Sequence, residues 1–217
     1  MPREQRDIIN SINLDAIGGA NPNSEPEDNQ KNKSLMSETW AYVWETIRII
    51  IVSLAIIIPI RYYLVQPFFV KGASMEDNFH DGDYLLIDEI SYRFNEPSRG
   101  DVIVFRYPEN PSQYFIKRII GLPGETVEVK NNRVTIYNSE FTGGFVLDES
   151  YLSSDQITVG DFSEVLDDDE YFVLGDNRRQ SSDSRRWGPL EKGFITGKAF
   201  LRLWPFTRIT KVSAIEY

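Results

Sequence analysis

A dense apolar run near the N-terminus constrains the fold of this chain more than any other feature. Arg48 and Arg61 bracket 12 uncharged residues, Ile49 to Ile60, which as a helix cover about 18 Å against roughly 30 Å of hydrocarbon in a bilayer. Spanning therefore requires the two arginines to snorkel and the flanks to contribute, and four aromatic residues suit the interfaces: Trp40, Trp44, Tyr62 and Tyr63. We expect a transmembrane anchor at residues 37–66; a buried core helix kinked at Pro59 is the alternative.

The segment before the anchor is polar. Residues 1–36 are rich in Asn, Ser, Asp, Glu and Pro, a composition that predicts a disordered tail. We interpret the apolar patch from Ile8 to Ile17 as a transient amphipathic turn, with a docking helix as the alternative. Lysines 31 and 33 precede the apolar run while Arg61 and Lys71 follow it, so positive charge alone does not decide which side faces the cytoplasm.

Composition narrows the function classes. A net charge of -10 argues against a nucleic-acid partner. The chain has no Cys and a single His, His80, so thiolate nucleophiles and thiolate metal sites are excluded, and a Ser-His-Asp triad would depend on that one histidine. We interpret His80 as a turn residue and expect no metal and no cofactor. Any nucleophile in this chain then needs a base other than histidine.

Beyond residue 66 short alternating segments separated by Gly, Pro, Asn and Asp predict a mainly β domain at 67–217. Asn131 and Asn132 tolerate positive φ and predict a hairpin. Residues 131–170 form an expected loop-rich β insertion, with the acidic part at 138–169 interpreted as solvated surface. The candidate strands are Tyr84–Asp88, Val102–Arg106, Tyr114–Ile120, Thr126–Lys130, Arg133–Tyr137, Tyr171–Leu174 and Lys198–Trp204.

Lys117 is a candidate general base. In a strand, Phe115, Lys117 and Ile119 share one face, while Arg118 points to the other. A lysine flanked by apolar side chains can be desolvated, which lowers its pKa and supplies a neutral amine. Taken alone, this segment favours a lysine on an edge strand exposed to water.

Two further segments complete a possible site. Ser74 follows Gly72 and Ala73, small residues that allow close approach of a substrate backbone. The stretch from Gly175 to Gly188, GDNRRQSSDSRRWG, is dense in turn formers and charges. Its aspartates and arginines, Asp176, Arg178, Asp183 and Arg185, could make bidentate pairs, and its serines could orient an amine.

Taken in order, four segments resemble the sequence boxes of bacterial type I signal peptidases: GASM at Ser74, RGDVIVF at 99–105, IKRIIGLPGETV at 116–127, and GDNRRQSSDSRRWG. The resemblance runs from about Trp40 to Trp204. It implies a signal-peptidase β-fold with one N-terminal transmembrane helix, and a membrane-bound serine endopeptidase that removes signal peptides from exported preproteins. It also implies a plasma-membrane location with the catalytic domain on the extracytoplasmic face.

The same resemblance implies roles for individual residues. Ser74 would be the acyl-forming nucleophile and Lys117 its base, with Ser181 holding the lysine amine, and Asp183 and Arg185 supporting the loop. Shallow substrate pockets would be lined by Phe68, Val70, Met75, Phe79 and Ile116. We expect preproteins and the bilayer as partners, and a monomer.

The sequence departs from the family pattern at two places. Some relatives carry a serine hydroxyl two positions before the nucleophile, where this chain has Gly72, so a second oxyanion donor is not identified. The family usually has Pro-Thr-Leu where this chain has Asp77, Asn78 and Phe79. The second departure bears on the groove more than on proton transfer.

Two other functions remain open at this point. One is a Ser/Lys autoprotease of the kind seen in SOS-response repressors, which would carry a helical DNA-binding domain in place of the tail and apolar run. The other is a catalytically inactive, membrane-tethered β-domain that acts as a binding or scaffold protein. The joint presence of Ser74, Lys117 and Ser181 argues against the inactive domain.

Overall fold

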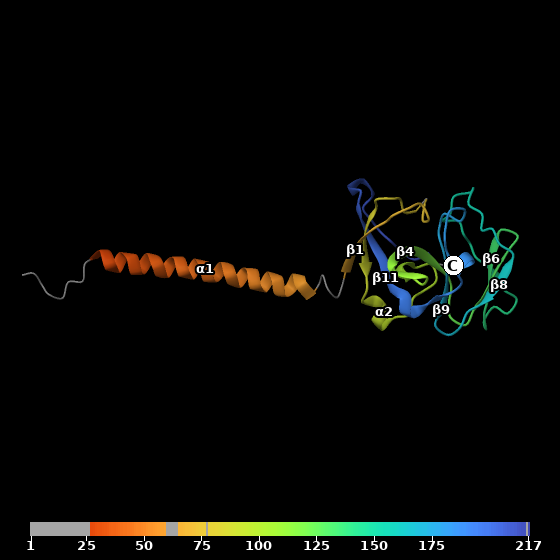
Figure 1. Ribbon diagram of the computed structural model, residues 1–217, viewed down its shortest axis with the longest axis horizontal. Coiled ribbons are helices and arrows are strands. Elements are labelled where there is room, and N and C mark those ends of the chain that lie inside the picture. The colour runs from red at the N-terminus through yellow and green to blue at the C-terminus, as the bar shows by residue number, and fades with distance from the viewer. Residues whose placement is uncertain (1–26, 60–64, 77, 216) are drawn as a thin grey trace, which may run out of the picture. The chain divides into compact units, whose positions relative to one another are not determined.

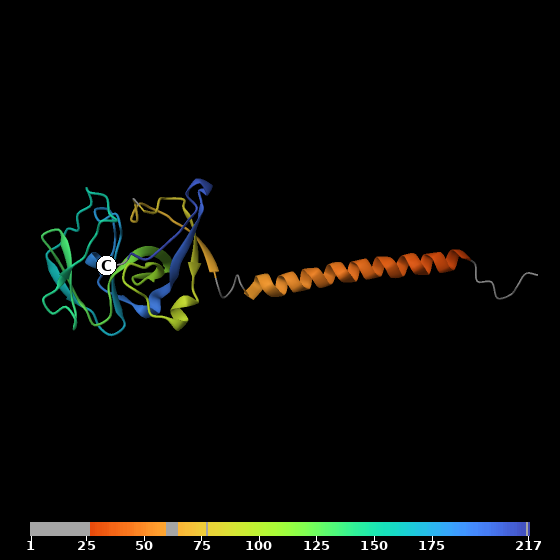
Figure 2. The ribbon, with the colours of Figure 1, turned by 180° about the vertical axis from the view of Figure 1, so that it is seen from behind.

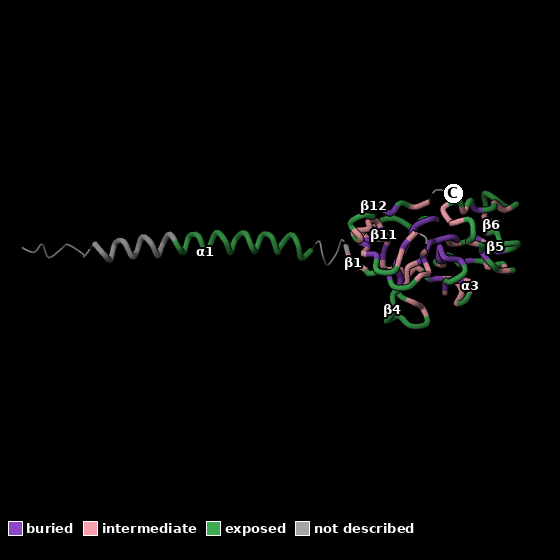
Figure 3. The backbone as a smooth tube through the Cα atoms, turned by 90° about the horizontal axis from the view of Figure 1, so that it is seen from above, coloured by how far each residue is buried: buried purple, intermediate pink, exposed green. Residues whose placement is uncertain are grey.

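The N-terminal part of the chain is one long helix. The computed structural model describes residues 27–59, 65–76, 78–215 and 217, and helix α1 spans Glu27–Pro59 (Figure 1). Its segment Thr39–Pro59 is 21 residues long, has a mean hydropathy of 2.0 and has none of its length buried (Figure 3). By length and composition this segment can cross a membrane.

The helix differs in extent from the expected anchor. It begins at Glu27, so residues 27–36, interpreted from composition as part of a disordered tail, are helical. The described part of the helix runs to Pro59, and the proline lies inside it. The apolar patch at Ile8–Ile17 and the last residues of the expected anchor, 60–64, lie outside the described residues.

From Val65 onward the chain is mainly β, which confirms the expected fold class. The larger sheet has eight strands in the order β1-β2-β11-β3-β4-β9-β10, with β12 paired to β11, and every pairing is antiparallel. Figures 1 and 2 show the β domain from opposite sides. Its strands are β1 (Val65–Phe69), β2 (Tyr84–Asp88), β3 (Val102–Tyr107), β4 (Asn110–Gly121), β9 (Glu170–Leu174), β10 (Leu190–Glu191), β11 (Ile195–Trp204) and β12 (Thr210–Lys211).

The smaller sheet is an excursion between β4 and β9. It has four antiparallel strands in the order β7-β6-β5-β8, namely β5 (Thr126–Lys130), β6 (Arg133–Tyr137), β7 (Phe145–Val146) and β8 (Phe162–Val165). Short helical turns connect the remaining strands: α2 (Ser91–Phe94), α3 (Ser184–Trp187), η5 (Lys192–Phe194) and η6 (Phe206–Arg208).

The alternation of apolar and polar residues predicted the strands that have one face toward solvent. β2, β5 and β6 alternate between buried and less buried positions, and each matches its expected bounds. The β5–β6 turn has φ values of 52° at Asn131 and 60° at Asn132, the left-handed backbone of a two-residue hairpin. β1, β7, β8, β10 and β12 were not expected, because such short or irregular segments carry little periodic signal.

The central strands are buried on both faces. β3, the second half of β4 and β9 each contain at least four consecutive buried residues, visible as the purple tube inside the β domain in Figure 3. Separate apolar clusters pack there, one around Met75 and Leu85, one around Ile120 and Phe172, and one around Phe105 and Ile119. Neighbouring residues of β4 therefore point into different parts of the interior, and both faces of this strand are shielded from water.

The acidic segment 138–169 is more ordered than a solvated surface insertion. It contributes β7 and β8 to the smaller sheet, and Leu147, Thr158 and Leu166 are buried. Its acidic composition hid these few inward-facing positions.

The β5–β6 hairpin yields a stability prediction. Asn132→Val should lower the free energy of unfolding by about 1–2 kcal/mol, because a β-branched residue is strained at positive φ. Asn132→Gly should leave stability equal or raised, since glycine adopts this backbone freely. Thermal unfolding of both variants measures the difference, and equal melting temperatures would contradict it.

Candidate active site

Ser74 lies in a tight turn between β1 and β2. Gly72 has φ +87° and its N–H donates to Asp81 Oδ1 at 2.7 Å, while Phe79 N–H donates to Met75 O at 2.8 Å. The side chains of Met75 and Phe79 are 0% and 3% exposed in the core below. This burial anchors the turn, because shifting it would expose both side chains to water.

Lys117 approaches Ser74 from β4. Its Nζ donates a hydrogen bond to Ser74 Oγ at 2.8 Å and another to the Ile116 carbonyl at 2.8 Å, and it lies 5.2 Å from the centre of the Phe115 ring. The segments that carry the two residues are separated by 43 positions in the sequence. The β-sheet brings the amine and the hydroxyl within proton-transfer distance.

Burial changes the protonation of this amine. Lys117 is only 3% exposed, and desolvation lowers its pKa from 10.5 to about 8, against the opposing effect of the Asp183 and Asp176 carboxylates. At pH 7 a pKa of about 8 leaves roughly a tenth of the amine neutral, roughly 300-fold more than for an ordinary lysine. Of the two interpretations open for Lys117, the desolvated amine is the one observed.

The pair opens into a groove. A cavity of about 670 Å³ has both Ser74 and Lys117 in its wall, and much of the remaining wall is apolar. Of the expected substrate-contacting residues, Phe68, Val70 and Ile116 line this groove. Met75 and Phe79 do not line it and belong to the core beneath, so any effect they have on substrate is indirect. The other lining residues are Phe69, Lys71, Gly72, Ala73, Leu85, Val104, Gln113, Tyr114, Phe115, Gln180 and Ser182.

The loop after β9 packs against the nucleophile turn. Asp183 caps α3 by accepting from Arg185 N–H, pairs with the Arg185 guanidinium at 2.8 and 2.9 Å, and accepts from Gly175 N–H at 3.1 Å. Burial opposes ionisation of Asp183, but its bonds with Arg185 hold its pKa below the usual value. The expected bidentate pair within this loop is therefore present.

Ser181 lies in the same loop and is 3% exposed. Its hydroxyl helps to lower the pKa of the Asp183 carboxyl, yet within the described ranges Ser181 Oγ has no hydrogen-bond partner of normal geometry. The Lys117 amine donates to Ser74 and Ile116 instead. That Ser181 orients the amine stays a prediction.

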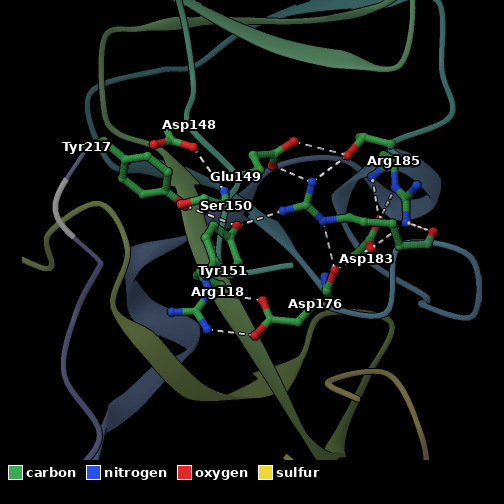
Figure 4. A network of polar contacts seen from close by, with 12 residues as sticks. Arg118, Asp148, Glu149, Ser150, Tyr151, Asp176, Asp183, Arg185 and Tyr217 are labelled. Atoms are coloured by element: carbon green, nitrogen blue, oxygen red, sulfur yellow. Dashed lines mark hydrogen bonds and ion pairs between the residues drawn. The ribbon is translucent and has the colours of Figure 1, made fainter. Parts of the chain in front are cut away.

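The other two charges of the loop pair outside it. Asp176 binds Arg118 through two bonds of 2.9 and 2.6 Å and accepts from Asn78 Nδ2 at 2.9 Å. Arg178 contacts Glu149, and also donates to Tyr151 at 2.7 Å. Figure 4 labels Glu149, Tyr151 and the pair of Arg118 and Asp176. The sequence suggested that these charges pair inside the loop. Their partners instead lie on β4 and in the segment between β7 and β8, and spacing along the chain does not reveal such distant contacts.

Arg118 was seen from the sequence only as the cation facing away from Lys117. Its guanidinium is buried, lies 4.6 Å from the centre of the Tyr151 ring, and is neutralised by Asp176. A buried arginine needs a carboxylate to neutralise its charge. From the sequence, this need was the signal that an acidic residue such as Asp176 pairs with Arg118.

Sequence reasoning also missed Asn177. Its side chain is 7% exposed, and Nδ2 donates to the Ala73 carbonyl at 3.0 Å. Its own N–H donates to the Ser74 carbonyl at 3.1 Å. His80, by contrast, lies in a turn in which His80 N–H donates to Asp83 Oδ2 at 3.0 Å. In the part of the chain that the structure covers, no three His, Cys, Asp or Glu side chains gather as metal ligands.

Comparison with known proteins agrees with this geometry. The sequence profile of a family described as "Signal peptidase, peptidase S26" matches residues 43–204. The chain belongs to this family. The resemblance drawn from the four sequence boxes is thereby confirmed, and the chain is a peptidase with a family-typical apolar helix ahead of its β domain.

Individual relatives are similar over most of their length. Signal peptidase I of Leptolyngbya laminosa is 39% identical over 175 residues, covering 76% of this chain and 81% of the relative. Probable signal peptidase I-2 of Synechocystis is 34% identical over 189 residues, covering 84% and 82%. Signal peptidase I of Bacillus licheniformis is 32% identical over 174 residues, covering 78% and 92%. The matches favour a signal peptidase over a repressor-type autoprotease.

Gly175 gives a test of the packing between the two loops. A Cβ atom there would overlap Ser181 Oγ and the Ser74 carbonyl oxygen. Gly175→Ala should therefore push the turn that carries Ser74 away from the loop after β9 and lower kcat at least about tenfold. The free energy of unfolding should fall by about 1–3 kcal/mol. Gly193→Ala is the matched control, because a Cβ there meets nothing within 4 Å. Peptide hydrolysis and thermal unfolding measure both; unchanged activity in Gly175→Ala would contradict the packing argument.

Proposed function

We propose that this peptidase removes N-terminal signal peptides from exported preproteins, with Ser74 as the acyl-forming nucleophile and Lys117 as its general base. The observation that carries the proposal is the 2.8 Å contact between Lys117 Nζ and Ser74 Oγ, made by an amine whose pKa burial lowers to about 8. A hydroxyl beside a neutral amine in an open groove is equipped for acyl transfer.

The proposed acylation step uses one nitrogen twice. Neutral Lys117 takes the proton of Ser74 as Oγ attacks the scissile carbonyl, and the carbonyl π pair moves onto oxygen. The ammonium then gives that proton to the leaving amine as the C–N bond breaks, which leaves an ester on Ser74. Water, deprotonated by the same amine, attacks the ester; the bond between the acyl carbon and Ser74 Oγ breaks, the ammonium returns the proton to Oγ, and the signal peptide leaves with a new carboxyl end.

The negative oxygen of each tetrahedral intermediate needs a hydrogen-bond donor. The backbone N–H of Ser74 is the candidate, because no acceptor for it occurs among the described residues. Such a donor is typically worth about 3–4 kcal/mol. Gly72 contributes no hydroxyl, and its N–H is bound to Asp81.

The groove is consistent with a substrate that presents small apolar residues. Phe68, Val70 and Ile116 form part of its wall beside the dyad, and shallow apolar surfaces accept side chains such as Ala better than long or charged ones. We propose small residues at the first and third positions before the cut. Ser181, Asp183 and Arg185 are proposed to maintain the position of Lys117 and its loop.

The N-terminal helix supports a membrane location. The Thr39–Pro59 segment can span a bilayer, and the family is membrane-anchored. We propose a single-pass plasma-membrane protein with residues 67–217 as the protease domain on the extracytoplasmic face, where translocated preproteins emerge, acting as a monomer. No observation favours the alternative of an inactive tethered domain.

The dyad is tested by cleavage of a precursor that carries an Ala-x-Ala site. Ser74→Ala and Lys117→Ala, in the full chain purified in detergent, should each lose at least about 10³-fold in kcat/KM, since the first removes the attacking atom and the second removes its base. Lys130→Ala, a change at an exposed residue of the β5–β6 hairpin, should cleave as the wild type does. Undiminished cleavage by both dyad variants would exclude the mechanism and leave the tethered domain.

The pH profile is a separate test. Only neutral Lys117 is active, so kcat/KM should rise through a midpoint near pH 8, the lowered pKa of the amine, and fall about tenfold per unit below pH 7. A folding control by circular dichroism at each pH separates loss of activity from unfolding. A rate independent of pH from 6 to 9 would be incompatible with a lysine base.

A further inference from the structure

The backbone around Ser74 is held from behind by Asn177. Asn177 Nδ2 donates to the Ala73 carbonyl at 3.0 Å, and Gln180 N–H donates to Asn177 Oδ1 at 3.1 Å. Because Oδ1 already accepts a backbone N–H, the amide group can present only its NH₂ to Ala73. The orientation of the side chain is therefore defined by its own bonds, and it is 7% exposed.

The Ala73 carbonyl and the Ser74 N–H belong to the same peptide unit. That unit is planar and trans, so the C=O and the N–H point in opposite directions. An anchor on the carbonyl consequently sets the direction of the N–H. Asn177 also binds the next carbonyl, that of Ser74, through its backbone N–H at 3.1 Å, which limits rotation of the turn.

The two ends of this peptide unit face different surroundings. Ala73 and Ser74 line the groove, whereas Asn177 lies buried behind them. With its carbonyl bound to Asn177, the unit directs the Ser74 N–H to the groove side, where no described residue accepts it. We propose that Asn177 is a positioning residue that aims the Ser74 N–H at the oxyanion; this rests on the proposed function.

Two features make the direction of the Ser74 N–H important for catalysis in this chain. Gly72 offers no side-chain donor, and its own N–H is bound to Asp81, so Gly72 cannot share the stabilisation of the oxyanion with the Ser74 N–H. A hydrogen bond accepted by the carbonyl also polarises the peptide unit and strengthens the N–H as a donor. Loss of the hydrogen bond from Asn177 to the Ala73 carbonyl should therefore both weaken the Ser74 N–H as a donor and change its direction.

The test compares Asn177→Asp, Asn177→Ala and Arg179→Ala in the full chain. Asn177→Asp keeps the acceptor for Gln180 N–H but loses the donor to Ala73, while Arg179 is an exposed neighbour on the same loop and serves as the control. We expect kcat for the Ala-x-Ala precursor, measured above each variant's pH midpoint, to fall about 10–100-fold in both Asn177 variants, with KM within about twofold. The midpoint should stay near 8 in Asn177→Ala, which adds no charge, whereas the carboxylate of Asn177→Asp should move it upward because it favours the protonated Lys117 amine. Arg179→Ala should match the wild type.

A peptide boronic acid ending in Ala-x-Ala separates positioning from structure. Ser74 Oγ forms a bond to the trigonal boron, its proton passes to the Lys117 amine, and the boron becomes a tetrahedral anion, one of whose oxygens occupies the oxyanion position. Its affinity should fall in both Asn177 variants by the same factor as kcat/KM. Binding of the uncleaved precursor, measured in a Ser74→Ala background with and without the Asn177 change, should stay equal.

Each outcome decides the proposal. Normal kcat and normal boronic acid affinity in Asn177→Asp would overturn it. Parallel losses of precursor binding, boronic acid binding and melting temperature would assign Asn177 a structural role only, and would also overturn it. Either result, obtained while Ser74→Ala and Lys117→Ala remain inactive, would leave the proposed function standing; full activity of those two variants would remove the function itself.

Discussion

The site depends on one amine that is kept out of water. Lys117 is buried on β4, and the cost of desolvating its charge is what brings the pKa down to about 8. Two carboxylates nearby, Asp183 and Asp176, act against this shift. Each is engaged elsewhere, Asp183 by Arg185 and Asp176 by Arg118, and neither makes an ion pair with Lys117. The pairing of acids with arginines leaves burial as the dominant influence on the amine.

The same ion pairs join the catalytic segments mechanically. Asp176 binds Arg118, the residue after the proposed base, and accepts a hydrogen bond from Asn78, four residues after the proposed nucleophile. Arg178 extends the network to Glu149 and Tyr151 (Figure 4), and Tyr151 accepts a hydrogen bond from Tyr217 at 3.0 Å. Breaking one partner of a buried pair is costly because it leaves an uncompensated charge. The proposed proton transfer at the groove thus depends on charged residues that do not themselves line the groove.

The sequence predicted the parts that local chemistry specifies. Strands with one face toward solvent, such as β2 and β5, were predicted with their bounds, because the alternation of apolar and polar residues can be read within the strand itself. The short strands β7 and β8 were missed, since their pairing is decided by neighbours far along the chain. The four boxes identified Ser74 and Lys117 as candidates, and the structure brings the two atoms together. Met75 and Phe79 could not be separated from true groove residues such as Phe68, because an apolar side chain beside a nucleophile suits either a wall or a core. Asn177 was missed for a related reason: an Asn in a polar loop is common, and its contact with Ala73 spans 104 positions.

The smaller sheet leaves β4 and returns at β9, and these two strands are neighbours, with Arg118 opposite Leu174 and Ile119 opposite Val173. The hydrogen bonds between β4 and β9 join the two ends of the segment that forms the smaller sheet. The positions of Lys117 and of the loop after β9 are therefore set by this backbone pairing and not by the smaller sheet. Lengthening a loop whose ends are already joined adds little chain entropy cost, which grows only with the logarithm of loop length. The exposed turn at Asn131–Asn132 lies at the end of the β5–β6 hairpin away from β4, and is therefore a place where the chain can accept additional residues, or an entire grafted module, without displacing Ser74 and Lys117.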